Sequence, residues 1–515
     1  NGTSGTDTIK ALGDGNVDVG FKRFDASCGI EVIDASGAKG TVRLLGDDGA
    51  NLLDFRNTKF IGTNIVIDGG YGDDIIYGSA NADTIMGGGG NDTLNLGKGS
   101  DTYLVTGNVA GGWSSFQGYD TYADDGTSGT DTIKALGDGN VDIGFKKFDT
   151  SCGIEIVDAS GAKGTVRLLG DDGANVLDFR TTKFIGTNIV IDGGYGDDSI
   201  SGSANADTII GGGGNDSLNG STGSDTYIIT GNMAGGWSSF QGYDLYADNG
   251  TTGTDTIKAL GDGNVDIGLK KFDTSCGIEI IDGSGAKGTV RLVGDTAANV
   301  LDFRTTTFLG TNIIIDGDYG NDIISGSIGK DNIRGGEGND IVIGNAGADT
   351  LNGGNGNDLI MDNRGNDLLV GEAGKDRFVL GYTDHSTVDL WGGNVGATGD
   401  ATTDCFTLLN SKTGLDMSAI IHDFERGKDR IDLTQLRDAD NNALGLDDLV
   451  ITTTNGNTTV SFASGIHTIA GGAVNVQMVL QGVTSTLNAA DFAFTDAQLP
   501  SGLPTVDQGL PYLIA

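Results

Sequence analysis

Short apolar runs separated by glycine- and aspartate-rich segments recur along most of the chain. In the first 70 residues, four such runs follow one another at intervals of roughly 9 to 13 residues, with Gly, Asp and Asn between them. Runs of this length, bounded by turn residues, predict β-strands rather than helices. The strands are expected at 30–33, 41–45, 52–55 and 64–67. Their irregular spacing favours a β-helix with corners of variable length.

The same pattern returns with a long period. The segment Thr6 to Lys10 recurs as Thr130 to Lys134 and Thr254 to Lys258, a period of 124 residues, and long stretches match almost letter for letter. Near-identical copies indicate a building block used several times rather than three different active sites. The first residues start within a repeat, which predicts a processed product or part of a longer array.

The second half of each repeat has a stricter period of nine. The segment 69–77 reads Gly-Gly-Tyr-Gly-Asp-Asp-Ile-Ile-Tyr, and the following nonapeptides keep an aspartate in the sixth place. Six residues of the type G-G-x-G-x-D form a tight turn, and the remaining three form a short strand with one apolar side chain facing the core. We expect Ile75, Ile85 and Leu94 to be such core residues.

Two nonapeptides complete one coil, so loops eighteen residues apart should stack on the same side. Stacked loops would place two carboxylates and several glycine carbonyls around one position. Ca²⁺ takes six to eight oxygen ligands, whereas Mg²⁺ favours a smaller octahedral shell and keeps its waters. A purely structural role, in which the aspartates only cap turns, is disfavoured because stacked carboxylates repel one another without a cation.

Composition and charge agree with this interpretation. The chain of 515 residues has 91 glycines but only 3 prolines, so glycine serves tight turns rather than a Gly/Pro-rich linker. The formal net charge is −40, which disfavours nucleic acid and anionic membranes as partners. Only six of the 71 acidic residues are glutamates, and the short aspartate side chain suits turns and cages for hard cations. No apolar run is long enough for a transmembrane helix.

The nonapeptides at 69–104, 193–228 and 317–379 resemble the RTX (repeats-in-toxin) calcium-binding family. The resemblance implies a parallel β-roll that folds when calcium enters after secretion, with aspartate side chains and glycine carbonyls as ligands. Pairing loops eighteen residues apart gives about nine ions, whose charge would offset 18 of the 40 negative charges. The candidate metal ligands are Gly70, Gly72, Asp74, Asp83, Gly88, Gly90, Asp92, Asp101, Gly194, Gly196, Asp198, Asp207, Gly212, Gly214, Asp216, Asp225, Gly320, Asp322, Asp331, Gly336, Gly338, Asp340, Gly347, Asp349, Gly354, Gly356, Asp358, Gly365, Asp367, Gly374 and Asp376.

Some loops depart from the pattern. The loop 78–83 has a single glycine, which predicts a weaker or absent ion. The segment 2–7 is a degenerate copy of the loop, and the sequence leaves open whether Asp7 binds an ion. The pair Asp47-Asp48 becomes Asp295-Thr296 in the third repeat, which favours a surface turn.

After about residue 379, glycine becomes less frequent and mixed α+β signals appear. Short helices or turns are expected at 418–424 and 444–449, and strands at 448–454, 458–462, 474–481 and 492–494. The segment 421–433, Ile-His-Asp-Phe-Glu-Arg-Gly-Lys-Asp-Arg-Ile-Asp-Leu, together with 479–492, resembles the C-terminal region of serralysin-type proteins. In that family the region caps the roll and carries a type I secretion signal.

Asp423, Asp429 and Asp432 in this segment could bind a further ion, but capping and hydrogen bonding are favoured.

Other chemistry-bearing residues give weaker signals. Cys28, Cys152 and Cys276 are equivalent positions too far apart for an intrachain disulfide, so small buried hydrophobic residues are favoured over intermolecular bridges. Of the three histidines, none lies in a zinc motif, and Asp384-His385-Ser386 makes a poor triad because adjacent residues rarely converge on one centre.

The aromatic inserts containing Trp113 and Trp237 favour packing between repeats over an exposed patch for self-association or carbohydrate stacking.

The sequence therefore predicts an all-β parallel β-roll or β-helix solenoid with a β-rich cap, divided into three repeats at 1–124, 125–248 and 249–379 and a C-terminal region at 380–515. The expected function is non-enzymatic: an extracellular structural protein of a bacterial surface, exported by type I secretion, that folds and self-associates in calcium as an S-layer, sheath or filament subunit. Cell-surface polysaccharide is a further candidate partner. The alternatives are the C-terminal stalk of an RTX adhesin and the calcium-binding module of a secreted protease or polysaccharide-modifying enzyme.

Overall fold

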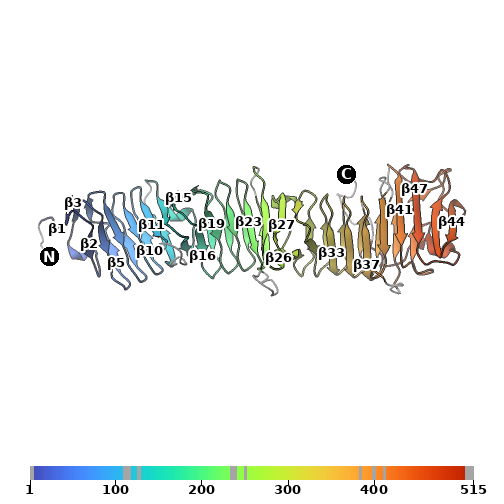
Figure 1. The fold of residues 1–515 in the computed structure, drawn as a ribbon, viewed down its shortest axis with the longest axis horizontal. Helices are drawn as coiled ribbons and strands as arrows, with labels where there is room; N and C mark the ends of the chain where they lie inside the picture. Colours follow the sequence, from blue (N-terminus) through green and yellow to red (C-terminus); the bar gives the residue numbers. More distant parts are fainter. Residues whose placement is uncertain are drawn as a thin grey trace. The chain divides into compact units, whose positions relative to one another are not determined.

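The computed structural model describes residues 5–107, 117–124, 129–231, 241–248, 252–362, 364–381, 386–396, 402–409 and 413–504. These residues form two compact units, the first made of Asn1–Ile229 with Asp244–Lys258 and the second of Thr230–Tyr243 with Ala259–Ala515. Within each unit, short strands stack side by side as successive rungs of parallel sheets (Figure 1). The predicted division into three repeats and a C-terminal region stays a prediction.

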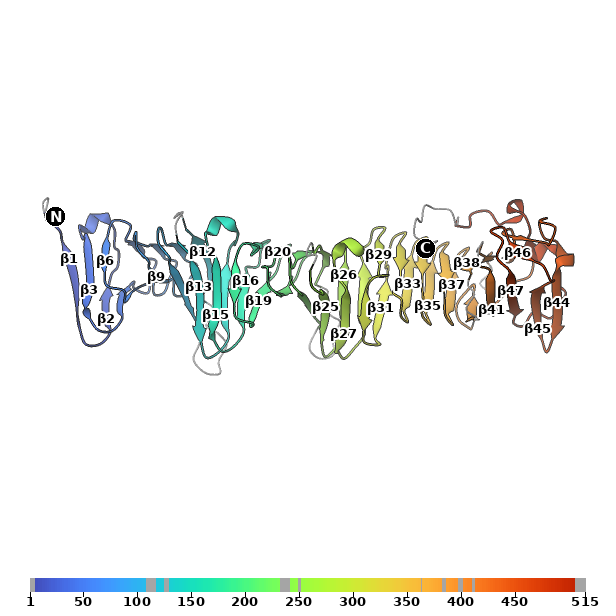
Figure 2. The same ribbon diagram turned by 90° about the horizontal axis from the view of Figure 1, so that it is seen from above.

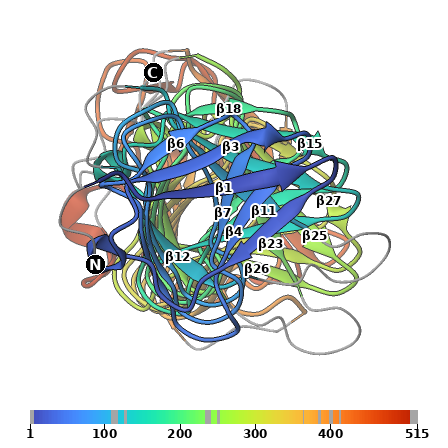
Figure 3. The same cartoon turned by 90° about the vertical axis from the view of Figure 1, so that its left-hand side faces the viewer.

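The first unit begins with a parallel sheet of three strands, which lie side by side at the front of Figure 3. They are β1 (Thr8–Gly13), β3 (Val32–Ala38) and β6 (Lys59–Ile61). A second parallel sheet contains β2 (Val17–Gly20), β4 (Val42–Leu45), β7 (Ile65–Asp68), β9 (Thr84–Met86), β11 (Thr102–Thr106), β13 (Thr132–Gly137), β15 (Ile156–Ala162) and β18 (Lys183–Ile185).

A third sheet of this unit contains β5 (Leu52–Asp54), β8 (Ile75–Tyr77), β10 (Thr93–Asn95), β12 (Tyr119–Ala123), β14 (Val141–Phe145), β16 (Val166–Gly170), β19 (Ile189–Asp192), β21 (Thr208–Ile210) and β23 (Thr226–Thr230). The strands β17 (Val176–Asp178), β20 (Ser199–Ser201), β22 (Ser217–Asn219) and β24 (Tyr243–Tyr246) form a further ladder. The strand β25 (Thr256–Gly261) contains residues of both units, and β23 and β24 each have one terminal residue in the second unit.

The second unit continues the same architecture. One sheet contains β26 (Val265–Leu269), β28 (Val290–Gly294), β31 (Ile313–Asp316), β33 (Asn332–Glu337), β35 (Thr350–Asn355), β37 (Leu368–Ala373), β39 (Ser386–Trp391), β41 (Leu415–Ile421), β47 (Val474–Leu480), β45 (Asn457–Phe462) and β44 (Leu449–Thr454). Another contains β29 (Val300–Asp302), β32 (Ile323–Ser325), β34 (Ile341–Ile343), β36 (Leu359–Asp362), β38 (Arg377–Leu380), β40 (Cys405–Leu408), β42 (Arg430–Asp432) and β48 (Phe492–Ala493). This unit also holds the pairs β27 (Ile280–Ala286) with β30 (Thr307–Leu309) and β43 (Leu436–Arg437) with β46 (His467–Thr468).

Helical structure among the described residues is limited to six 3-10 turns. They are η1 (Ala26–Cys28), η2 (Thr150–Cys152), η3 (Thr274–Cys276), η4 (Leu446–Asp448), η5 (Ala489–Asp491) and η6 (Asp496–Gln498). The protein is all-β, as the sequence predicts. A search of these residues for a helix long and apolar enough to cross a membrane finds none.

The three-residue strands of the nonapeptides place one side chain each in the core. The middle residues Ile76, Ile85 and Leu94 are almost fully buried, whereas Ile75 is 41% exposed. The prediction that Ile75 faces the core is therefore wrong, because Ile75 is the first residue of its strand and side chains alternate between the two faces. The predictions for Ile85 and Leu94 are confirmed.

The C-terminal region ends the parallel stack with antiparallel pairing. The strands β44, β45 and β47 pair antiparallel, while β47 pairs parallel with β41 (Figure 2). The expected helix or turn at 418–424 is wrong over its first half, since Ser418 to Ile421 belong to β41. The alternation of buried and partly exposed side chains along β41 explains this, because it is the period-2 pattern of a strand between two neighbours.

The repeated cysteines end the 3-10 turns η1, η2 and η3, each capped at its start by an aspartate side chain. All four cysteines are free, with Cys152, Cys276 and Cys405 buried and Cys28 exposed. The buried-residue interpretation thus holds for Cys152 and Cys276 and is wrong for Cys28, which lies in the first described coils of the chain.

Candidate metal centres

Loops eighteen residues apart stack in register and are joined through their aspartates. The backbone N–H of Asp74 donates to Oδ1 of Asp92 at 2.8 Å, and that of Asp83 donates to Oδ1 of Asp101 at 2.7 Å. Because successive nonapeptides alternate between the two sides of the coil, these bonds form two separate series, which we call the first and second aspartate ladders. The predicted stacking of loops is confirmed.

The first ladder runs through the loops that begin each array, and the second through the loops that alternate with them. In the first ladder, each aspartate accepts a backbone N–H from the rung before it; its members are Asp74, Asp92 and Asp120, then Asp198, Asp216 and Asp244, then Asp322, Asp340, Asp358, Asp376, Asp404 and Asp429. The second ladder consists of Asp83, Asp101 and Asp131, then Asp207, Asp225 and Asp255, then Asp331, Asp349 and Asp367.

The second oxygen of ten rungs has no hydrogen-bond donor among the described residues. Oδ2 is buried, and lacks a hydrogen-bond partner among the described residues, in Asp74, Asp92, Asp101, Asp198, Asp216, Asp225, Asp322, Asp340, Asp349 and Asp358. A buried polar atom without a partner costs about 1–3 kcal/mol, and more when the group is charged. The repetition of the same feature in every array indicates that these oxygens face a common ligand.

Glycine allows the loops to come close enough for their backbone oxygens to lie beside the carboxylates. All sixteen glycines among the candidate ligands have a positive φ. At Gly88, φ is 101°, and a Cβ would lie 2.0 Å from the carbonyl oxygen of Gly70 in the stacked loop. The glycine five residues before Asp74 is equally restricted, since a Cβ at Gly69 would lie 2.3 Å from Oδ2 of Asp74. A larger residue at these positions would separate the loops.

Burial raises the pKa of several ladder carboxyls. Desolvation raises the pKa of Asp74 to about 7 and that of Asp92 to about 6, with a smaller contribution to Asp74 from its neighbour Asp92. The rungs Asp198 and Asp340 behave alike, with pKa values of about 7 and about 6. In the absence of a cation, the fold thus disfavours the ionised form that a hard cation requires.

In one loop of each array, a serine of the loop donates hydrogen bonds to both oxygens of the loop's own aspartate. In the loop 78–83, the N–H of Ser79 donates to Oδ2 of Asp83 at 2.6 Å and its hydroxyl donates to Oδ1 at 3.0 Å. Ser203 and Ser327 make the same bonds to Asp207 and Asp331. The serine stands at the position of the second glycine, which supports the expectation of a weaker ion at the loop 78–83.

The residues present fit a hard divalent cation. The unpartnered Oδ2 atoms and the adjacent glycine backbones supply only oxygen, the ligand type that Ca²⁺ prefers. The strongest influences on the pKa of Asp74 and Asp92 are burial, a backbone N–H and other carboxylates, so the charge of these rungs is left for a cation to neutralise. The ligands would come from stacked loops of one ladder, so one ion would join two successive coils.

Sequence reasoning missed three rungs that lie outside the arrays. Asp120 and Asp244 lie in the inserts that contain Trp113 and Trp237, and Asp404 lies in the C-terminal region, where the sequence already marks Asp429 as a candidate for a further ion. The signal that could have found Asp120 is the short Gly-Tyr-Asp at 118–120, which keeps the last part of the loop pattern.

The degenerate copies of the loop differ between the three repeats. Asp131 and Asp255 end the Gly-x-x-Gly-x-Asp copies equivalent to 2–7, and they extend the second ladder. Asp7, at the equivalent position of the first repeat, is exposed.

The remaining candidates show structural roles. Asp423 accepts from the N–H groups of Gly392 and Gly393, and Asp432 accepts from Arg377 and Thr407, in line with the favoured capping role. Asp47 caps its own turn by accepting from Gly49 N–H and Asn51. His422 Nε2 lies 2.9 Å from an Asp389 oxygen.

The two tryptophans of the aromatic inserts, Trp113 and Trp237, and the histidine of the disfavoured triad, His385, lie outside the described residues.

Comparison with protein-family models identifies four RTX calcium-binding nonapeptide repeat segments, at residues 68–103, 192–227, 316–351 and 352–381. Their limits agree with the arrays that the sequence predicts at 69–104, 193–228 and 317–379. A comparison with curated proteins gave no match.

Proposed function

We propose that this chain, which carries RTX calcium-binding nonapeptide repeats, is a secreted structural protein that folds when Ca²⁺ enters its aspartate ladders and then self-associates at a bacterial surface. Calcium binding and an extracellular location are typical of proteins with these repeats. Beyond these two properties, we propose that folding is coupled to calcium binding, that the protein is exported by type I secretion, and that its role is structural.

The observation that carries the folding step is the buried Oδ2 atom that lacks a hydrogen-bond partner among the described residues in ten of the ladder aspartates. Stacked carboxylates repel one another and lose hydration when the coils close. A cation between loops would reverse both effects at once, because it supplies the missing ligand and neutralises the charge. Binding free energy then becomes folding free energy.

Circular dichroism of the full chain in a calcium chelator, followed by titration with Ca²⁺ or Mg²⁺, tests this step. We expect little β-structure in chelator and a cooperative gain with Ca²⁺ but not with Mg²⁺ at the same concentration. A β-rich spectrum that does not change between chelator and Ca²⁺ would exclude calcium-dependent folding.

Self-association is supported by the near-identity of the repeats and by an exposed tyrosine that each repeat carries at the same position. Tyr71, Tyr195 and Tyr319 occupy equivalent positions 124 residues apart and have 69%, 69% and 55% of their surface exposed. Exposed aromatic residues are enriched at protein interfaces. Electron microscopy of the purified protein should show ordered assemblies in Ca²⁺ and none in chelator; absence of assemblies in both would contradict the surface-lattice role.

The same repetition favours a structural over a catalytic role, since a scaffold gains from copies and an active site does not.

Export by type I secretion is proposed from the resemblance of the segment 421–433 to serralysin-type C-terminal regions. Fusing residues 380–515 to a reporter and measuring its release by a type I exporter would test it, with a reporter lacking the segment as control.

A further inference from the structure

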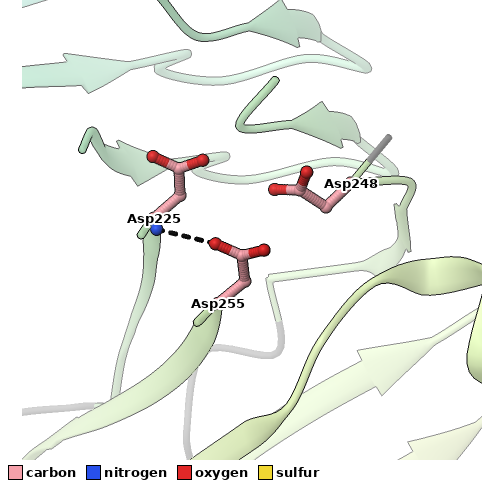
Figure 4. Close-up of side chains that lie close together, drawn as sticks. All are labelled: Asp225, Asp248 and Asp255. Atoms are coloured by element: carbon pink, nitrogen blue, oxygen red, sulfur yellow. Dashed lines mark hydrogen bonds between the residues drawn. The ribbon is translucent and has the colours of Figure 1, made fainter. Parts of the chain in front are cut away.

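Three buried aspartates meet at the end of the second nonapeptide array. Asp225, Asp248 and Asp255 each offer a carboxylate oxygen, and these oxygens lie within 4.8 Å of one another. Figure 4 shows Asp248 facing the other two, with the N–H of Asp225 donating to Oδ1 of Asp255 at 2.8 Å. All three are at most 4% exposed and belong to the first compact unit.

A second feature of this cluster points to a ligand. Oδ2 of Asp225 is buried and accepts no hydrogen bond from the described residues, while the whole residue is only 1% exposed. Two oxygens that share one Ca²⁺ at about 2.4 Å are separated by at most about 4.8 Å. The three carboxylates meet this limit as they stand, and at such spacing they repel one another unless a cation lies between them or a proton is shared.

The cluster draws on residues that the nonapeptide pattern does not include. Asp225 lies near the end of the matched segment 192–227, whereas Asp248 and Asp255 lie beyond it. Asp248 follows β24, and Asp255 precedes β25 at the start of the third 124-residue repeat. We propose that Asp225, Asp248 and Asp255 form a separate cation site, a junction site, in which a Ca²⁺ ion joins the end of one nonapeptide array to the start of the next repeat.

The preceding junction has the same three residue types at the same spacing. Asp101, Asp124 and Asp131 precede Asp225, Asp248 and Asp255 by 124 residues each. There too the N–H of Asp101 donates to Oδ1 of Asp131 at 2.8 Å, and Oδ2 of Asp101 is buried without a hydrogen-bond partner among the described residues. The third array instead continues with further nonapeptides, and Asp367 takes the rung after Asp349. The residue pattern of the junction site thus recurs where the first array stops.

The carboxylate from outside the ladders is held in place by a buried tyrosine. The Tyr227 hydroxyl donates to Oδ2 of Asp248 at 3.0 Å and itself accepts the N–H of Gly220 at 2.6 Å. The carboxylate of Asp248 lies on the side of Asp225 and Asp255 (Figure 4). Tyr227 is a positioning residue, and its hydrogen bond can be removed without removing a carboxylate.

The test is the number of calcium ions bound per chain, measured on the full-length folded protein by equilibrium dialysis against Ca²⁺ and metal analysis. Asp248→Asn keeps the size and can still accept from Tyr227, but lacks the charge. We expect it to lose a single ion relative to the unmodified protein, and Asp124→Asn with Asp248→Asn to lose two. Asp172→Asn removes an exposed carboxylate of the same repeat and should leave the number unchanged. Tyr227→Phe should also leave the number unchanged and weaken only the affinity of that ion.

The outcomes separate the junction site from the proposed function on which its choice of ion rests. If the unmodified chain binds no calcium, calcium-dependent folding is wrong. If it binds calcium and Asp248→Asn binds the same number, the carboxylates share protons and the junction site is wrong. Circular dichroism in Ca²⁺ accompanies each measurement. If Asp248→Asn does not fold, Asp248→Glu, which keeps the charge, must restore both fold and ion number; failure to do so overturns the proposal.

Discussion

At the residue scale, the two oxygens of a ladder aspartate have different roles. Oδ1 of Asp216 accepts the N–H of Asp198, which fixes the register of the stacked loops, while its Oδ2 is buried without a hydrogen-bond partner among the described residues. Asp207 has the same backbone bond on its N–H, but Ser203 occupies both of its oxygens. The residue at the second loop position therefore sets how much a loop depends on a cation.

Asp216→Asn should weaken calcium-dependent folding by about tenfold or more in the Ca²⁺ concentration at the midpoint, since bonds to buried charged groups contribute about 1.5–3 kcal/mol. Circular dichroism during calcium titration measures it. Asp197→Asn is the matched control, because Asp197 is an exposed carboxylate in the stacked loop. Equal midpoints for the two variants would show that the Asp216 carboxylate does not bind the ion.

The raised pKa values predict how the calcium-free protein responds to pH. The carboxyls of Asp74 and Asp198 have a folded-state pKa of about 7, raised by burial, against about 4 in an unfolded chain. A raised pKa of an acid stabilises the fold at low pH, and this stabilisation is lost as pH rises from about 4 to about 7. In chelator, β-structure measured by circular dichroism should therefore be greater at about pH 5 than at about pH 8. The reverse order would contradict the burial of these groups in the calcium-free fold.

At the element scale, each nonapeptide strand contributes one core side chain to a column that runs along the sheet. Ile76 in β8 lies in register with Leu53 in β5 and Leu94 in β10. All three are nearly fully buried, so the strands are held together by this column as well as by their backbone bonds. A three-residue strand has no second core residue that could compensate if this side chain were truncated.

Ile76→Ala should destabilise the calcium-loaded protein by about 2–5 kcal/mol, the usual cost of truncating a buried aliphatic side chain. Its neighbour Ile75 is 41% exposed, so Ile75→Ala should cost far less. Denaturant unfolding in saturating Ca²⁺ compares the two on the same strand. A larger effect at Ile75 would reverse the assignment of the core face.

At the scale of the whole molecule, the parallel coils need an end. In the second unit, β45 pairs antiparallel with β47, and β44 pairs antiparallel with β45, so the parallel stacking stops there. An exposed edge of a parallel stack would invite pairing with another chain. The cap therefore leaves the faces and loops of the coils, rather than their C-terminal edge, as surfaces for self-association.

Replacing Tyr71, Tyr195 and Tyr319 together by serine should abolish ordered assembly and leave calcium-dependent folding intact, because these rings are exposed and lie at the loop surface. Electron microscopy and circular dichroism give the two readouts on one sample. Assemblies of normal order in the triple variant would show that another surface makes the contacts.

The sequence alone could determine the period and the ligand type. A nonapeptide with one aspartate and one core residue has room only for a turn and a short strand. Because the nonapeptide is repeated, every loop stacks on the next in the same register. For this reason the stacking at eighteen residues and the positions of Asp74, Asp92 and Asp340 followed from spacing. The strands at 449–454, 457–462 and 474–480 were also predictable, since these short runs are rich in β-branched Val, Ile and Thr.

Only the tertiary structure decided what lies between segments that have no common period. It extends the first ladder to Asp120 and Asp404 across spacings of 28 residues, brings Asp248 beside Asp225, and makes Ser418 to Ile421 part of a strand. It also shows Ser79 satisfying the carboxylate of Asp83. Spacing along the chain fixes contacts only while each coil has the same length; where a coil is longer, hydrogen bonding between neighbouring coils selects the residue that continues the stack.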